Sequence, residues 1–191
     1  GTVVINGIGS RWTNHSQLEV GDRGSGAITV ENGGSLMAGA AWLATVPGSS
    51  GSVDVRGAGS EWSGNERLYV GYRGNGTLTI EDGGKVSSES GTVAFGPMSV
   101  GTATVSGANS SWDISGSLEI GGSSIFGEGG AGTLQIDPLG AVNVADEVVL
   151  FPDGLVHLNG GTLTADAIGF EYGGVFDWST GRLHVDAFAG D

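Results

Sequence analysis

The sequence predicts an all-β protein, a right-handed parallel β-helix (β-solenoid) of about seven to eight coils, each with three short strands. The first observation is a regular spacing of glycines. Gly1, Gly26, Gly51, Gly76 and Gly101 stand 25 residues apart, and each opens the phrase glycine–x–apolar–x–apolar. A fixed period of this length is typical of solenoids, propellers and repeat arrays.

The second observation is the alternation inside each phrase, which continues with looser spacing from Gly132, Gly154 and Gly174. Positions 3 and 5 are apolar in every unit, and the residue between them is mostly polar. This pattern predicts a strand with one buried face. The apolar pairs are Val3/Ile5, Ile28/Val30, Val53/Val55, Leu78/Ile80, Ala103/Val105, Leu134/Ile136, Val156/Leu158 and Phe176/Trp178.

The third observation is that each regular unit carries two further short apolar segments, separated by glycine-rich corners. The middle segments carry Trp12, Leu36, Trp62, Val86 and Trp112, and the last carry Leu18/Val20, Leu43, Leu68/Val70, Val93/Phe95 and Leu118/Ile120. Three short strands in one period describe a β-helix coil. A propeller blade needs about 40–50 residues and antiparallel hairpins, whose Asn-Gly or Asp-Gly turns do not recur at the required spacing. Crossovers between parallel strands favour a right-handed coil.

A longer period overlies the first. Trp12, Trp62 and Trp112 are 50 residues apart, and a serine precedes each by two positions. Alternate coils therefore differ. An indole carries a large apolar surface and one N–H group, so we expect each ring in the core or at a corner, spanning two coils.

The regular spacing fails after residue 121. Residues 1–121 hold the regular repeats, 122–131 read as an inserted glycine-rich loop, and 132–191 read as irregular acidic terminal coils. We interpret the chain as a single β-solenoid fragment. Because it begins at Gly1, on a repeat boundary rather than at Met, we expect it to be a piece of a longer protein.

Composition excludes several classes of function. The formal net charge is −14, and residues 86–191 contain 13 acidic side chains and one basic one, Arg182. Nucleic acids and anionic membrane surfaces require clustered Lys and Arg, so we expect neither as a partner. The chain has no cysteine, and no apolar run approaches the ~18 residues that span a membrane. We therefore expect no membrane insertion of this segment.

The segments GAGSEW, LYVG, LEIG and GTLTIEDGGKV resemble the repeats shared by type V secretion (autotransporter) passengers and by PEP-CTERM-sorted surface proteins of bacteria. The resemblance covers about residues 1–121. The segment GGVFDWSTGRLHVDAFAGD is similar to the stretch that often closes such arrays in the second group. The resemblance implies an exported, surface-associated β-helix and supplies no catalytic residues.

The expected function is a non-catalytic structural or adhesive segment, such as a stalk, matrix or adhesin element, at the bacterial cell surface or outside the cell. Its expected partners are neighbouring coils of the parent chain, surface glycans or matrix polysaccharide, and other copies associating end to end, because unpaired strand edges associate. One alternative is a carbohydrate-binding β-helix module. Another is a polysaccharide-degrading β-helix enzyme.

Each alternative names residues. A sugar site would use exposed rings of Trp12, Trp62 and Trp112, or the loop residues Ile125 and Phe126. An enzyme would use paired carboxylates roughly 5–10 Å apart. Asp146, Glu147 and Asp153 are candidates by proximity, with Asp166, Glu171 and Asp177 in neighbouring coils. No cofactor is expected, except that Asp146, Glu147 and Asp153 are also the candidate ligands for calcium.

Overall fold

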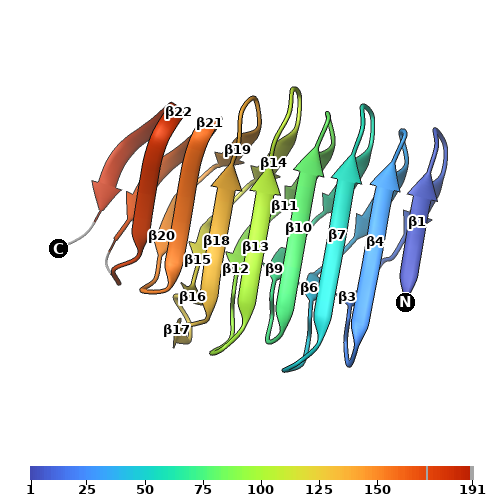
Figure 1. The fold of residues 1–191 in the computed structure, drawn as a ribbon, viewed down its shortest axis with the longest axis horizontal. Helices are drawn as coiled ribbons and strands as arrows, with labels where there is room; N and C mark the ends of the chain where they lie inside the picture. The colour runs from blue at the N-terminus through green and yellow to red at the C-terminus, as the bar shows by residue number, and fades with distance from the viewer. Residues whose placement is uncertain (171, 190–191) are drawn as a thin grey trace.

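The computed structural model describes residues 1–170 and 172–189 and forms a parallel β-helix of eight coils. The chain rises through the front sheet in Figure 1, returns behind it, and advances steadily towards the C-terminus, which makes the coil right-handed. The fold prediction is confirmed. None of the described residues forms a helix that could cross a membrane.

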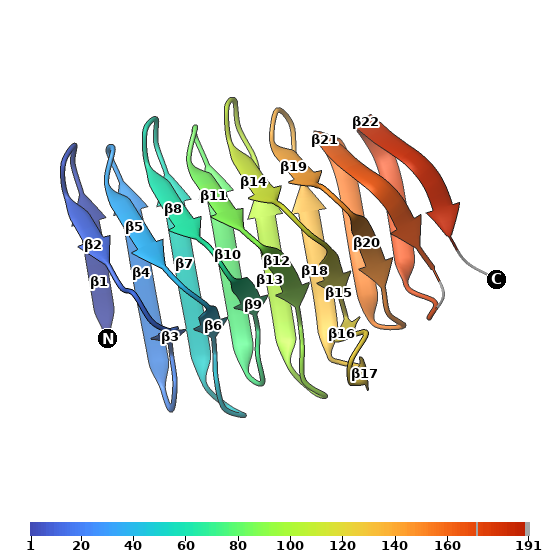
Figure 2. The same ribbon diagram turned by 180° about the vertical axis from the view of Figure 1, so that it is seen from behind.

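Each of the first six coils contains three strands (Figures 1 and 2). The first strands are β1 (Thr2–Asn6), β4 (Ser25–Glu31), β7 (Ser50–Arg56), β10 (Asn75–Glu81), β13 (Val100–Val105) and β18 (Ala131–Ile136). The second strands are β2 (Arg11–Thr13), β5 (Ser35–Ala38), β8 (Glu61–Gly64), β11 (Lys85–Ser88), β14 (Ser111–Ile114) and β19 (Ala141–Val144). The third strands are β3 (Leu18–Val20), β6 (Ala41–Leu43), β9 (Arg67–Val70), β12 (Ser90–Val93), β15 (Leu118–Ile120) and β20 (Glu147–Leu150).

The last two coils are continuous strands, β21 (Gly154–Gly169) and β22 (Val175–Ala189). Between β15 and β18 the chain makes a small antiparallel hairpin, β16 (Gly122–Ser123) with β17 (Gly127–Glu128). This hairpin occupies the stretch expected as a loop. The parallel register passes across it without a shift, since Val100 pairs with Ala131.

The core consists of apolar columns that run along the axis. Register places each position above its counterpart one coil earlier, so that Ile28 pairs with Val53 and Val53 with Leu78. The inward residues of the first strands are buried from Ile28 to Leu158. Trp178 also lies in such a column, opposite Leu158, but it is 53% exposed, which contradicts its expected burial. The reason is that no described strand covers its far side.

The glycine that opens each unit is required because there is no room for a side chain at its position. A Cβ atom on Gly51 would lie 2.0 Å from the Val20 carbonyl oxygen, and one on Gly76 would lie 2.0 Å from the Gly71 nitrogen. The positive φ needed to turn this corner falls instead on the residue after the third strand, such as Gly71 at 81°. The strand-opening glycine therefore allows two stretches of backbone to touch.

The 50-residue alternation is a packing rule between neighbouring coils. Trp62 and Trp112 are 1% and 0% exposed. A Cβ on Gly91 would lie 2.9 Å from the Trp112 ring, so the glycine leaves room for the indole. Small and large residues therefore alternate, as close packing requires. Gly91 belongs to a column of inward residues in the third strands. From β3 to β15 this column consists of Leu18, Ala41, Leu68, Gly91 and Leu118. Phe95 was expected inward with Val20, Val70 and Ile120, but Val93 takes that place and Phe95 lies on the surface side of the following corner.

The two buried indoles differ in one polar contact. Trp112 Nε1 donates a hydrogen bond to Ser88 Oγ at 3.2 Å. Trp62 Nε1 is buried without a partner. The residue that stands 24 positions before Trp62, as Ser88 does before Trp112, is Ala38. A buried N–H group without an acceptor costs about 1–3 kcal/mol.

We predict that Ser88→Ala lowers the free energy of unfolding by about 1–3 kcal/mol because it removes the acceptor of Trp112. Ala38→Ser should raise it by up to about 1 kcal/mol by supplying an acceptor to Trp62. Urea unfolding followed by circular dichroism measures both. A neutral Ser88→Ala variant would contradict the assigned role of this hydrogen bond.

Candidate functional site

An open groove runs along the axis at the corner between the second and third strands of the later coils. It has a volume of about 770 Å³ and crosses five coils, from Gly64 in β8 to Asp166 in β21. One rim is a registered column of outward side chains, Ser87, Asp113, Asn143 and Thr164. The other rim is formed by Asn65, Glu89, Ser115 and Asp166.

The groove has polar rims, and its floor is formed by buried residues that face the core. Ser88, Ile114 and Val144 point their side chains into the core and lie between the two rims in the chain. Asp113 is held in place on its rim, because Asn143 Nδ2 donates to it at 2.7 Å and Ser111 Oγ at 2.8 Å. The rims repeat once per coil, at the strand spacing of about 4.8 Å. A linear ligand lying along the axis would meet one polar side chain of the first rim at each coil from β11 to β21.

The groove is negatively charged. Glu89, Asp113 and Asp166 line it, and none of its lining residues is Lys or Arg. Arg67, on the neighbouring face, is engaged elsewhere. It forms an ion pair with Glu119 at 3.1 Å, and the Glu119 side chain is only 6% exposed. The lining therefore favours neutral or cationic ligands and disfavours anionic ones.

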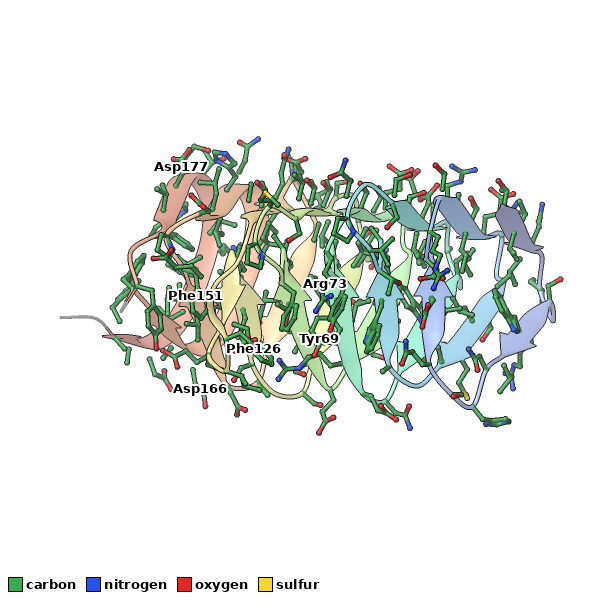
Figure 3. All side chains as sticks on the ribbon, turned by 90° about the horizontal axis from the view of Figure 1, so that it is seen from below. Tyr69, Arg73, Phe126, Phe151, Asp166 and Asp177 are labelled. Carbon is green, nitrogen blue, oxygen red and sulfur yellow. The ribbon has the colours of Figure 1, made fainter. Side chains whose placement is uncertain are left out.

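Five aromatic side chains form a second surface feature, the exterior aromatic cluster, on the third-strand face and the corner after it. Figure 3 shows Tyr69 and Phe126 on this side of the solenoid. Tyr72 stacks between two parallel rings, Trp42 at 4.6 Å and Phe95 at 4.8 Å. Tyr69 meets Trp42, Tyr72 and Phe95 edge-on. Phe126 adds a further edge-on contact to Phe95.

The exterior aromatic cluster is better suited to stabilising the coil than to binding sugar. Carbohydrate stacking requires a free ring face, and both faces of Tyr72 are covered by other rings. The Arg67 guanidinium lies over Tyr69, 5.8 Å from its ring centre. Each aromatic pair contributes about 0.5–1.5 kcal/mol beyond the area it buries. The pairs connect successive coils outside the core.

Sugar binding by exposed rings of Trp12, Trp62 and Trp112, the alternative given above, is contradicted for Trp62 and Trp112, and their expected position in the core is confirmed. Trp62 and Trp112 are buried in the core, and Trp12 is half-buried and packs against it. The second-strand register that brings these rings into one column also points them inward. Their spacing therefore reflects packing between coils.

Ile125 and Phe126 lie at the tip of the β16–β17 hairpin and are 71% and 74% exposed. Glu119 fixes the hairpin to the body, because the Ser124 backbone N–H donates to its carboxylate at 2.9 Å. Thr92 Oγ1 donates to the same carboxylate at 3.2 Å. The two apolar side chains are thus presented on an anchored hairpin, though only Phe126 makes an aromatic contact.

The carboxylates proposed for calcium or for catalysis do not converge. Asp146 lies at the corner before β20 and Glu147 is the first residue of that strand, whereas Asp153 lies at the corner after it. Among the described residues, no three His, Cys, Asp or Glu side chains are grouped so that they could hold a metal ion. Asp166 and Asp177 lie on opposite sides of the solenoid (Figure 3). Glu171 lies outside the described residues. Asp146 and Asp166 lie one coil apart at the same corner, where the Asp166 N–H donates to the Asp146 carbonyl oxygen at 2.8 Å, but Asp153 and Asp177 lie elsewhere.

The groove residues were largely missed from the sequence. Asp166 was considered, but with Asp177 rather than with Asp113 and Glu89. Aligning the second strands of successive coils would have placed Ser87, Asp113 and Asn143 in one outward column. The same alignment places Trp42 and Tyr69 at one outward position of the third strand, since they pair in the register of β6 and β9. The coil-by-coil alignment of polar positions was therefore the missing signal.

Comparison with known proteins gave no match among family models, curated proteins or solved structures. Function must therefore be argued from the geometry described above and from the resemblance of the repeats.

A charge cluster lies on the outer face of the first strands. Arg56 contacts Glu31 and Asp54 at 2.7 Å each. Asp54 Oδ1 is nevertheless buried without a hydrogen-bond partner. Burial raises the pKa of Asp54 above its usual 3.8, and this effect outweighs the lowering by Arg56. Protonation of Asp54 is therefore more favourable in the folded protein than in the unfolded chain.

We predict that Asp54→Asn stabilises the protein at neutral pH relative to the unchanged chain. Because the folded pKa is raised, ionised Asp54 destabilises the fold. Its unfavourable contribution begins as pH rises through the unfolded value of 3.8 and is complete above the folded value. Below 3.8 the difference between the two proteins should disappear. Urea unfolding across this pH range measures it, with Asp153→Asn as an exposed control. A variant less stable than the parent at neutral pH would contradict the prediction.

Proposed function

We propose that this chain is a rigid, non-catalytic structural segment of an exported bacterial surface protein, used as a stalk or matrix element. The observation that carries the proposal is the uninterrupted stacking of apolar columns through the coils, with inward residues from Ile28 to Leu158 buried. Such a body resists bending, because every coil is bonded to its neighbour through three parallel strand pairs.

Three further features support this function. The exterior aromatic cluster and the Arg67–Glu119 pair add connections between coils outside the core. Among the acidic candidates for catalysis, Asp146 and Asp166 share a corner, whereas Asp153 and Asp177 lie away from them. The repeats resemble those of exported bacterial surface proteins.

The proposal predicts that length can change without loss of the fold. Residues 2–51 and 52–101 are two copies of a double coil, and both place a tryptophan at the same position. Removing 52–101 keeps the alternation of large and small core residues and removes two coils. The shortened chain should fold cooperatively, with somewhat lower stability because two coil interfaces are lost.

Spin labels can measure the length directly, because the chain has no cysteine of its own. Ile8→Cys places a label in an exposed turn of the first coil, and Thr180→Cys places one at an exposed position of β22 in the last coil. The distribution of distances between the two labels should be narrow. It should centre at roughly 35 Å in the full chain and at roughly 25 Å after the deletion of residues 52–101. A broad distribution in the full chain would contradict a rigid rod. Removal of the single coil 27–51 is the matched control and should be more disruptive, because it brings Trp12 and Trp62 into adjacent coils.

A further inference from the structure

We infer that the axial groove lined by Glu89, Asp113 and Asp166 is a binding site for a linear glycan that carries free amino groups. This site goes beyond the structural role proposed above and does not depend on it. The rod could be rigid without binding anything here, and the groove could bind while serving another purpose.

The shape of the groove favours a linear polymer. It follows the axis across five coils and is open along its length, so an extended chain could enter from the side. Pockets of enclosed form suit compact ligands. Here the same kinds of group recur coil by coil, which matches a ligand that also repeats.

The chemistry of the lining favours a glycan. Hydroxyls and amides on the rims, such as Ser87, Ser115 and Asn143, can exchange hydrogen bonds with sugar hydroxyls. Ala145 is exposed in the groove and offers its methyl group to the C–H face of a pyranose ring, whereas Ile114 and Val144 beside it are buried and turn into the core. A peptide would favour separate pockets for its alternate side chains.

The charge of the groove selects among glycans. Glu89 and Asp166 belong to one rim and Asp113 to the other, and none of the lining residues is Lys or Arg. Protonated sugar amines lying along the groove would pass carboxylates on both sides. The carboxylates of a uronate polymer would be repelled by the same groups. Charge complementarity of this kind contributes mostly to selectivity.

Three hexasaccharides test the inference: hexaglucosamine, cellohexaose as its neutral counterpart, and hexagalacturonate as its anionic counterpart. Titration calorimetry at mildly acidic pH keeps the sugar amines charged and the carboxyls ionised. Hexaglucosamine should bind most tightly, and its binding should weaken with added salt. No binding of hexaglucosamine, or equal binding of cellohexaose, would overturn the inference.

Variants locate the site. Asp113→Asn, Glu89→Gln and Asp166→Asn should each weaken hexaglucosamine binding by about two- to five-fold, the size expected of exposed charge pairs. Ala145→Arg should weaken it further by placing a bulky cation in the groove. Asp153→Asn removes an exposed carboxylate outside the groove and should leave binding unchanged. Equal losses from Asp153→Asn would indicate diffuse attraction and overturn the site.

Two controls separate the remaining outcomes. Each variant is first checked for an unchanged unfolding midpoint, and Ser115→Ala serves as a neutral groove substitution if a charge variant is destabilised. Oligolysine tests whether cationic charge alone suffices. Oligolysine binding as tight as that of hexaglucosamine, with the same dependence on the groove variants, would overturn the assignment to a glycan.

Discussion

The parallel hydrogen bonding between coils is the constraint on which the rest of the structure depends. It fixes the distance between successive coils at about 4.8 Å and aligns each residue with its counterpart one coil away. Core side chains must therefore be compatible with their neighbours above and below, as well as with those across the coil. The alternation of Trp62 and Trp112 with smaller residues, and the space left by Gly91, follow from this axial packing. The backbone contact at Gly51 and Gly76 follows from the same closeness at the corner.

The same constraint orders the surface. Outward residues are also stacked in columns, so side chains of successive coils lie next to one another and together form one surface feature. One column brings Trp42 and Tyr69 together, and with Tyr72 and Phe95 they build a ring stack that fastens coils from outside. A second column lines the axial groove with Ser87, Asp113 and Asn143. The column of Trp42 and Tyr69 continues through Thr92 to Glu119, which supports the β16–β17 hairpin. Each feature is assembled from residues about one coil apart in the sequence, and none is visible in a single repeat.

Much of the fold could be predicted, because period and alternation are local properties of the sequence. The 25-residue glycine spacing and the apolar pairs of the first strands identified the coil, and the 50-residue spacing of tryptophan identified the two-coil unit. The position of Phe95 could not be predicted from hydrophobicity, because Gly91 and Val93 take the two inward places of β12 and leave the ring outside. The groove could not be predicted from proximity in sequence. Asp146 and Asp153 are near neighbours in the chain yet lie at different corners, whereas Glu89 and Asp166 are distant in the chain yet line one groove.

The hairpin between β15 and β18 shows that one corner of the coil is free in length. Although this coil is longer than its neighbours, Val100 still pairs with Ala131, so the solenoid continues beyond the hairpin in the same register. The entropy cost of a longer loop grows only slowly with its length. A rod of this kind can therefore acquire new surface at this corner by insertion without changing its core. Solenoids built in this way would then differ from one another in the structures inserted at this corner and would keep the same core.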